Sequence, residues 1–160
     1  MKTRLAVVLG LVIALAVFAG AAYAAKGGGY EGAWQAVDFD LSHEWMWIRN
    51  FAGVYEVLIY DDACSCCPPD ENAPIHFPCL AVGSGRVTTV DWEEGREPFQ
   101  ALVLDGIPIT CYTPSGPEFY ATGSWWLEYI EGTGILDQFG AMWTPSNDKK
   151  PEKVIPAILP

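Results

Sequence analysis

From Tyr30 to Pro145 the chain alternates between short runs of β-branched and aromatic residues and clusters of glycine, proline and aspartate. Almost nothing in this region repeats apolar residues at the spacing of an amphipathic helix. Short β-prone runs bounded by turn residues are typical of antiparallel sheets. We therefore expect an all-β fold, an antiparallel barrel or barrel-like sandwich of about eight short strands.

Individual strands can be placed on this pattern. Residues 37–41 alternate apolar and acidic side chains, which predicts a strand with one wet face. Residues 54–60 form a strongly apolar run. Residues 80–92 contain one or two further strands, with Gly83 and Gly85 at bulges or bends.

Two hairpins are also predicted. Asp105-Gly106 lies between two apolar runs and suits a two-residue type I′ turn, which requires positive φ at both positions. Pro108 lacks an N–H group, so its strand should lie at an edge or leave that position unpaired. Residues 118–130 and 135–143 resemble a second hairpin around the glycine-containing residues 131–134.

The N-terminus has the pattern of a cleavable secretory signal. Lys2 and Arg4 precede an apolar run over residues 5–18, and small residues frame a cleavage site at Ala22-Tyr23-Ala24. The run is shorter than the roughly 20 residues that span a membrane. We expect a signal peptide (1–24), a flexible leader (25–29), one domain (30–145) and a proline-containing tail (146–160). The tail could strap across the domain or remain exposed.

Export sets the expected surroundings and partners. The protein should be secreted or periplasmic, with no membrane span after signal cleavage. The full chain has 9 basic and 20 acidic residues and a net charge of −11. Cleavage removes Lys2 and Arg4, leaving a net charge of about −13. Such a surface repels phosphate backbones, which argues against a nucleic-acid partner.

The segment Gly32-Ala33-Trp34 resembles the G-x-W signature of lipocalins. Residues 121–136 are similar to the glycine-punctuated hairpins of calycin-like and allene-oxide-cyclase-like barrels. The resemblance implies a secreted β-barrel. Trp34 is out of phase with the Val37/Leu41 face, so a bulge must separate them if both point inward.

All five cysteines lie in the mature domain, where oxidising conditions favour disulfides. Adjacent Cys66 and Cys67 are poorly placed to bridge each other. We expect two of the three cysteines in the loop (64, 66 and 67) to pair with Cys79 and Cys111. The odd count leaves a free thiol or a cysteine-linked dimer.

A metal site is the alternative interpretation of this loop. Cys64, Cys66, His76 and Cys79 place thiolates and an imidazole close together in sequence, as copper(I) or zinc prefers. The spacing lacks the paired C-x-x-C units of a zinc ribbon. Disulfides are therefore the first interpretation, and no metal or other cofactor is predicted.

Catalytic residues are not predicted from the sequence. The chain has two histidines and no G-x-S-x-G elbow, so a hydrolase triad is unsupported. His43 and His76 are interpreted as surface or packing residues. The abundant carboxylates are interpreted as a solvated face, and an enzyme is the less favoured class.

Seven tryptophans are the most suggestive feature inside the domain. Large rings can fill a barrel core, or they can line a cavity for a small hydrophobic molecule or sugar. A barrel of eight strands is just wide enough to enclose one small ligand. The residues predicted to line such a cavity are Trp34, Trp45, Trp47, Tyr55 and Trp126.

The first function that we predict is therefore non-enzymatic binding of a small hydrophobic ligand. The alternatives are an allene-oxide-cyclase-like barrel enzyme and a disulfide-stapled structural or interaction protein of the cell envelope. An enzyme would need an ionisable group with a shifted pKa at its cavity. An interaction protein would have a filled barrel with exposed apolar patches.

Overall fold

The computed structural model describes residues 29–38, 40–65, 67, 76–91 and 95–156. The expected signal peptide lies outside these residues, as do Phe39, Cys66 and Trp92. Within the described part of the chain, no helix is both long and apolar enough to cross a membrane.

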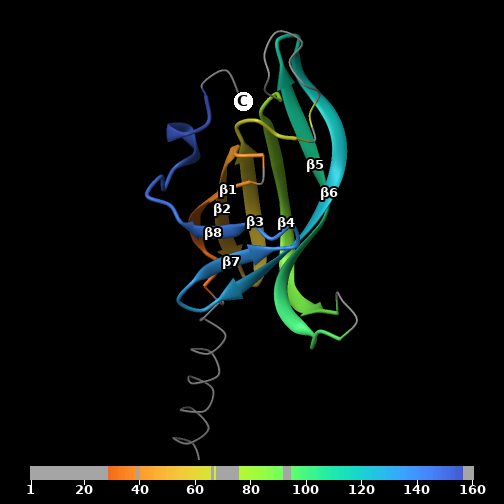
Figure 1. Ribbon diagram of the computed structural model, residues 1–160, viewed down its shortest axis with the longest axis vertical. Helices are drawn as coiled ribbons and strands as arrows, with labels where there is room; N and C mark the ends of the chain where they lie inside the picture. Colours follow the sequence, from red (N-terminus) through yellow and green to blue (C-terminus); the bar gives the residue numbers. More distant parts are fainter. Residues whose placement is uncertain (1–28, 39, 66, 68–75, 92–94, 157–160) are drawn as a thin grey trace, which may run out of the picture.

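Eight antiparallel strands form a closed barrel in which each strand pairs with its neighbours in sequence, and β1 closes the barrel against β8 (Figure 1). The predicted all-β barrel is thereby confirmed. The strands are β1 (Gly32–Val37), β2 (His43–Phe51), β3 (Val54–Asp61), β4 (Cys79–Val90), β5 (Phe99–Thr113), β6 (Gly116–Ile130), β7 (Gly134–Asp137) and β8 (Met142–Pro145). A short 3-10 helix, η1 (Pro151–Lys153), follows β8.

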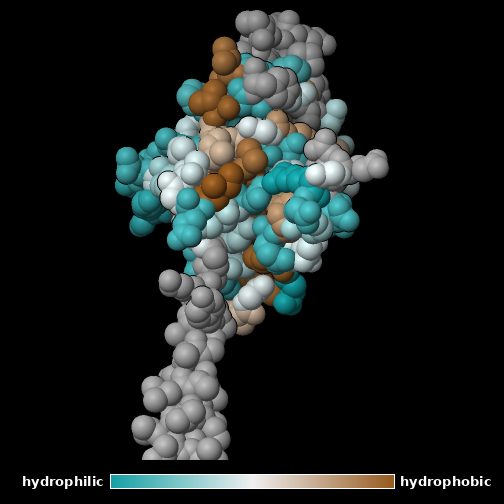
Figure 2. All heavy atoms as spheres, turned by 60° about the horizontal axis from the view of Figure 1, so that its bottom comes forward, coloured by the Kyte–Doolittle hydropathy of each residue, from teal (hydrophilic) through white to brown (hydrophobic). Residues whose placement is uncertain are grey.

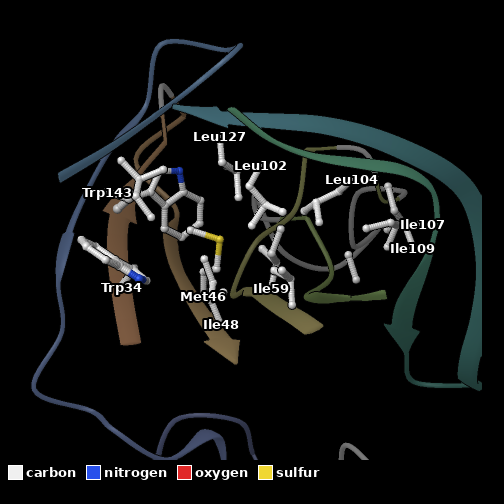
Figure 3. Packing of buried hydrophobic residues seen from close by; sticks show 14 of the residues in the cluster. Trp34, Met46, Ile48, Ile59, Leu102, Leu104, Ile107, Ile109, Leu127 and Trp143 are labelled. Carbon is white, nitrogen blue, oxygen red and sulfur yellow. The ribbon is translucent and has the colours of Figure 1, made fainter. Parts of the chain in front are cut away.

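The barrel interior is filled by apolar side chains from all eight strands (Figure 3). Met46 from β2, Leu102 from β5 and Leu127 from β6 are each 0% exposed. A water-sized cavity beside these side chains would leave part of their surface accessible, so the centre is packed. Figure 3 shows Trp34, Met46 and Trp143 gathered at one end of this cluster.

The predicted strand over residues 37–41 is wrong. Strand β1 begins earlier and ends at Val37, whose side chain is exposed. After β1, Leu41 N donates to Asp38 O, and Leu41 takes a positive φ of 72°. Trp34 and Ala36 therefore provide the buried face of β1, and no bulge is needed to bring Trp34 inward.

The hairpin predicted at Asp105-Gly106 is also wrong, because β5 runs through both residues without reversing. The register with β6 shifts between Leu104 and Ile107, which makes the dipeptide a β-bulge. Gly106 has φ 64°, so the turn-like conformation is present but is absorbed within a strand. The chain reverses later, at the turn between Thr113 and Gly116.

The predicted strand over residues 135–143 is wrong, because these residues form two short strands, β7 and β8, joined by a turn. The remaining strand predictions agree with the structure. Strand β3 matches the apolar run at 54–60, and residues 80–90 lie in one strand, β4, with an irregularity between Ala81 and Gly85. A side chain at Gly85 would collide with the Val103 carbonyl oxygen, so this close approach requires glycine. The hairpin at residues 131–134 joins β6 to β7.

The segment after β8 packs back on the outside of the barrel. Ser146 N donates to Ala33 O at 2.8 Å, and Trp47 Nε1 donates to Asp148 O at 2.9 Å. Val154 and Ile155 then contact a second apolar cluster on the outer face of the sheet. Residues 146–156 therefore lie as a strap across the barrel rather than as a free tail.

Asp137 organises the turn from β7 to β8. Its Oδ1 accepts hydrogen bonds from Phe139 N and Ala141 N, both at 2.9 Å, and its Oδ2 accepts from the buried Trp143 Nε1 at 3.0 Å. The residue as a whole is 4% exposed. One side chain thus satisfies three donors next to the strand that closes the barrel.

We expect Asp137→Asn to lower the free energy of unfolding by about 2 kcal/mol, because its amide NH₂ would face the Trp143 N–H and leave a buried donor unpaired. Urea denaturation followed by tryptophan fluorescence measures this. Asp105→Asn is the control, since it changes the same charge at an exposed bulge. Equal effects of the two substitutions would contradict the prediction.

Candidate functional site

The five aromatic residues predicted to line one cavity are distributed over both faces of the barrel. Trp34 and Tyr55 belong to the interior cluster. Trp45 and Trp47 point outward from β2 into the outer cluster. Trp126 lies on the other side of the barrel, where its ring meets Phe99 edge-on at 5.1 Å and Arg96 lies nearby. The structure therefore brings Trp45 and Trp47 together, and separately Trp34 and Tyr55.

The outer cluster is built by cross-strand pairs on β2, β3 and β4. Trp47, Leu58 and Val82 face one another in register across the three strands. In the next outward-facing row, Trp45 stacks on Tyr60 with ring centroids 5.8 Å apart. In these two rows the outward face of the strands is therefore apolar, unlike the wet outer face expected of a barrel in water.

A groove runs between this apolar face and the C-terminal strap. Its main pocket has a volume of about 570 Å³, and a neighbouring pocket of about 530 Å³ shares Leu58, Val82 and Pro151 with it. The main pocket is lined by Leu58, Leu80, Val82, Pro108, Thr110, Tyr112, Pro151, Glu152, Ile155 and Pro156. The groove is thus concave, largely apolar and of a size that suits a small organic ligand.

Sequence reasoning missed this groove. The signal that could have indicated it is the presence of apolar residues, Val154 and Ile155 among them, between the polar and proline residues of the tail. Those two residues need an apolar surface, and the outward-facing Trp45 and Trp47 provide it. On the face that Figure 2 shows, apolar residues form separate patches among hydrophilic ones.

A second unusual site lies inside one end of the barrel. Glu44, Asp61, Cys79 and Cys111 are consecutive register partners across β2, β3, β4 and β5, and we call them the acid–sulfur row. Glu44 shares the inward face of β2 with Met46 and Ile48. Polar and ionisable groups thus replace the apolar residues that fill the rest of the barrel.

Burial and neighbouring negative charge change the acidity of this row. Burial, followed by the charge of Asp61, raises the pKa of Glu44 from 4.5 to about 8. Burial likewise raises the pKa of Asp61 from 3.8 to about 6, although a hydrogen bond from Ala63 N acts in the opposite direction. Each neighbouring charge that raises these two values is a carboxylate. The row therefore favours protonated side chains.

Glu44 is also accessible from a pocket at this end of the barrel. The pocket has a volume of about 480 Å³ and lies between β1, the start of β2 and the β7–β8 turn. Its lining includes Gln35, His43, Glu44 and Trp45. His43 stacks on Trp45 with ring centroids 6.0 Å apart, as expected for a packing residue. A half-buried carboxyl group with a raised pKa thus lines a pocket.

The cysteines pair only partly as predicted. Cys67 and Cys111 form a disulfide with their Cα atoms 5.8 Å apart, which links the loop to β5 as expected. Cys64 is disulfide-bonded as well. The prediction that Cys79 pairs with a loop cysteine is wrong: Cys79 is a free, buried thiol next to Cys111 across the β4–β5 ladder.

The residues of the predicted metal site are in different environments. The Sγ atoms of Cys64, Cys67 and Cys79 lie within 4.8 Å of one another, and all three residues are buried. His76 uses its Nδ1 to contact the Cys67 carbonyl oxygen at 2.6 Å. Cys66 lies outside the described residues. The close group is therefore made of three sulfurs, with Cys67 in the place that the sequence suggested for Cys66.

Neither the known protein-family models, nor the curated proteins, nor the solved structures contain a match to this chain. The calycin-like resemblance remains a prediction. The function must therefore be argued from the two sites themselves.

Proposed function

We propose that the protein binds a small hydrophobic ligand in the groove between the outer face of the barrel and its C-terminal strap. The observation that supports this most directly is the apolar lining of the groove over a volume of about 570 Å³. Ligand pockets typically measure 300–1,000 Å³ and bury most of a small ligand among apolar and aromatic side chains. The outer groove is favoured over the barrel centre, which is already packed.

Binding would rest on removing apolar ligand surface from water. The contribution is about 25 cal/mol per Å² of buried apolar surface, so a ligand of modest size can reach micromolar affinity. The polar groups that line the main pocket are few: Thr110, Tyr112 and the carboxylate of Glu152. This composition favours a neutral, mostly hydrocarbon ligand with at most one hydrogen-bonding group.

A neutral environment-sensitive dye, Nile red, tests the proposal. The protein should enhance its fluorescence with saturable, micromolar binding, and Val82→Asp should weaken binding at least about tenfold, because Val82 lines both parts of the groove. Val87→Asp is the matched control: it makes the same change on β4, at a partly exposed valine that lines neither part. Equal binding by the two variants would exclude the groove.

A second candidate function is that of an allene-oxide-cyclase-like barrel enzyme. The observation that favours it is Glu44, whose pKa is raised and which lines a pocket of about 480 Å³. The same dye titration distinguishes binding at the two sites. Binding in the pocket beside Glu44 would be altered by Glu44→Gln and unaffected by Val82→Asp. Binding in the groove would give the opposite result.

A further inference from the structure

The three sulfurs of Cys64, Cys67 and Cys79 already have nearly the spacing of metal-bound thiolates. Thiolates that share one metal ion at about 2.3 Å lie roughly 4 Å apart. Here the three Sγ atoms lie within 4.8 Å of one another. Small side-chain rotations would therefore bring all three to one ion without moving β4 or the loop.

The surroundings of these sulfurs also favour a cation. Cys79 lies next to Asp61 in the register of β3 and β4, and Asp61 lies next to Glu44. The carboxyl groups of Asp61 and Glu44 therefore lie in the same row of side chains as a cation held by the three sulfurs, and such a cation would favour their ionised forms.

The oxidation state of the chain decides whether the sulfurs can bind a metal. Cys67 is bonded to Cys111, and Cys64 is also disulfide-bonded, so neither offers a thiolate in the structure. Each disulfide that accepts two electrons and two protons yields two thiols. Metal binding then releases the protons from the thiols that become ligands. A reductant, such as a phosphine that is oxidised to its oxide, must therefore act first.

We propose that Cys64, Cys67 and Cys79 form a copper(I) site that is available only when the disulfides of the chain are reduced. Three sulfur donors without nitrogen or oxygen match the preference of copper(I) for soft ligands. Zinc commonly takes four ligands, and the described residues offer this group no fourth His, Asp or Glu atom within the same distance. The site is separate from the outer groove and does not depend on the proposed ligand.

The test is an anaerobic titration with copper(I) against a coloured copper(I) chelator. Protein reduced with a phosphine should take one copper ion per chain from the chelator, and unreduced protein should take none. In the reduced state Cys79→Ser should bind copper(I) at least about tenfold more weakly. Cys79→Ser leaves the Cys67–Cys111 disulfide intact before reduction, so its fold can be verified independently.

Cys111→Ser is the matched control, because it also removes one thiol of the row but leaves the three proposed ligands. After reduction it should bind copper(I) as the unaltered protein does. Circular dichroism of the reduced protein should retain the β-sheet spectrum. Equal losses in both variants, equal binding by reduced and unreduced protein, tight binding of zinc without copper(I), or unfolding on reduction would each overturn the proposal.

Discussion

Removing the Cys67–Cys111 disulfide, in a Cys67→Ala/Cys111→Ala double variant, is expected to lower the free energy of unfolding by about 4 kcal/mol. The two residues are separated by 44 positions, and a cross-link that closes a loop of this length removes much of the conformational entropy of the unfolded chain. Cys111 is 1% exposed, so the substitution also leaves a small space beside β4. Guanidinium denaturation measures the difference.

Cys79→Ala is the control for this variant. It removes a buried sulfur from the same row but breaks no bond, so we expect a loss of about 1 kcal/mol. The two effects are distinguishable because they differ severalfold. A double variant that is no less stable than Cys79→Ala would show that the cross-link does not constrain the unfolded chain.

Stability is expected to fall as the pH rises from 5 to 9, and Glu44→Gln is expected to remove most of that fall between pH 6 and 8. The pKa of Glu44 is about 8 in the folded protein and near 4.5 when unperturbed. Between these values the folded state holds a proton that the unfolded state has released, so rising pH favours unfolding. Below pH 4.5 both states are protonated, and above pH 8 both are ionised.

Asp61 contributes in the same direction over a lower range, between pH 4 and 6, because its pKa is raised from 3.8 to about 6. At pH 9 we expect Glu44→Gln to be more stable than the unaltered protein by about 2 kcal/mol, after allowing for the partial exposure of this side chain. Thermal unfolding of both proteins across the pH range measures the pH dependence of stability and the difference in stability at pH 9.

Glu56→Gln is the control for this prediction. It removes one carboxylate from the outward face of the neighbouring β3 and thus changes the net charge by the same amount. If both glutamine variants shift the pH profile equally, the effect arises from the total charge of the acidic protein. In that case the attribution of the pH-dependent stability to Glu44 in the acid–sulfur row is wrong.

The barrel could be predicted because its signals are local. The apolar run at 54–60 and the glycine-rich turn at 131–134 specify a strand and a hairpin without reference to the rest of the chain. Asp105-Gly106 misled because the same positive φ serves a hairpin turn and a bulge. Whether a turn or a bulge forms depends on whether the partner strands continue past the dipeptide. The continuation of the partner strands is a property of the whole sheet.

The candidate sites could be predicted only in part. Glu44, Met46 and Ile48 are alternate residues of β2, so their side chains lie on the same face of the strand. The position of Glu44 inside the barrel could therefore be predicted from the sequence. The separation of Trp34 from Trp47 onto opposite faces required the register of β1 with β2. The groove required knowledge that the C-terminal segment returns to the sheet. That return is decided by contacts between residues about 100 positions apart, such as Trp47 with Asp148.

The neighbour-to-neighbour order of the strands has a consequence for how the chain reaches this structure. Seven of the eight strand pairings join strands that are consecutive in sequence, so each pair can form its hydrogen bonds starting from the connection between its two strands. The eighth, between β1 and β8, joins opposite ends of the domain through only two register pairs, Trp34 with Pro145 and Gln35 with Thr144. Loop-closure entropy opposes such a distant contact until the intervening hairpins are formed. The seam between β1 and β8 is therefore the step expected to set the folding rate and the first place where the barrel opens.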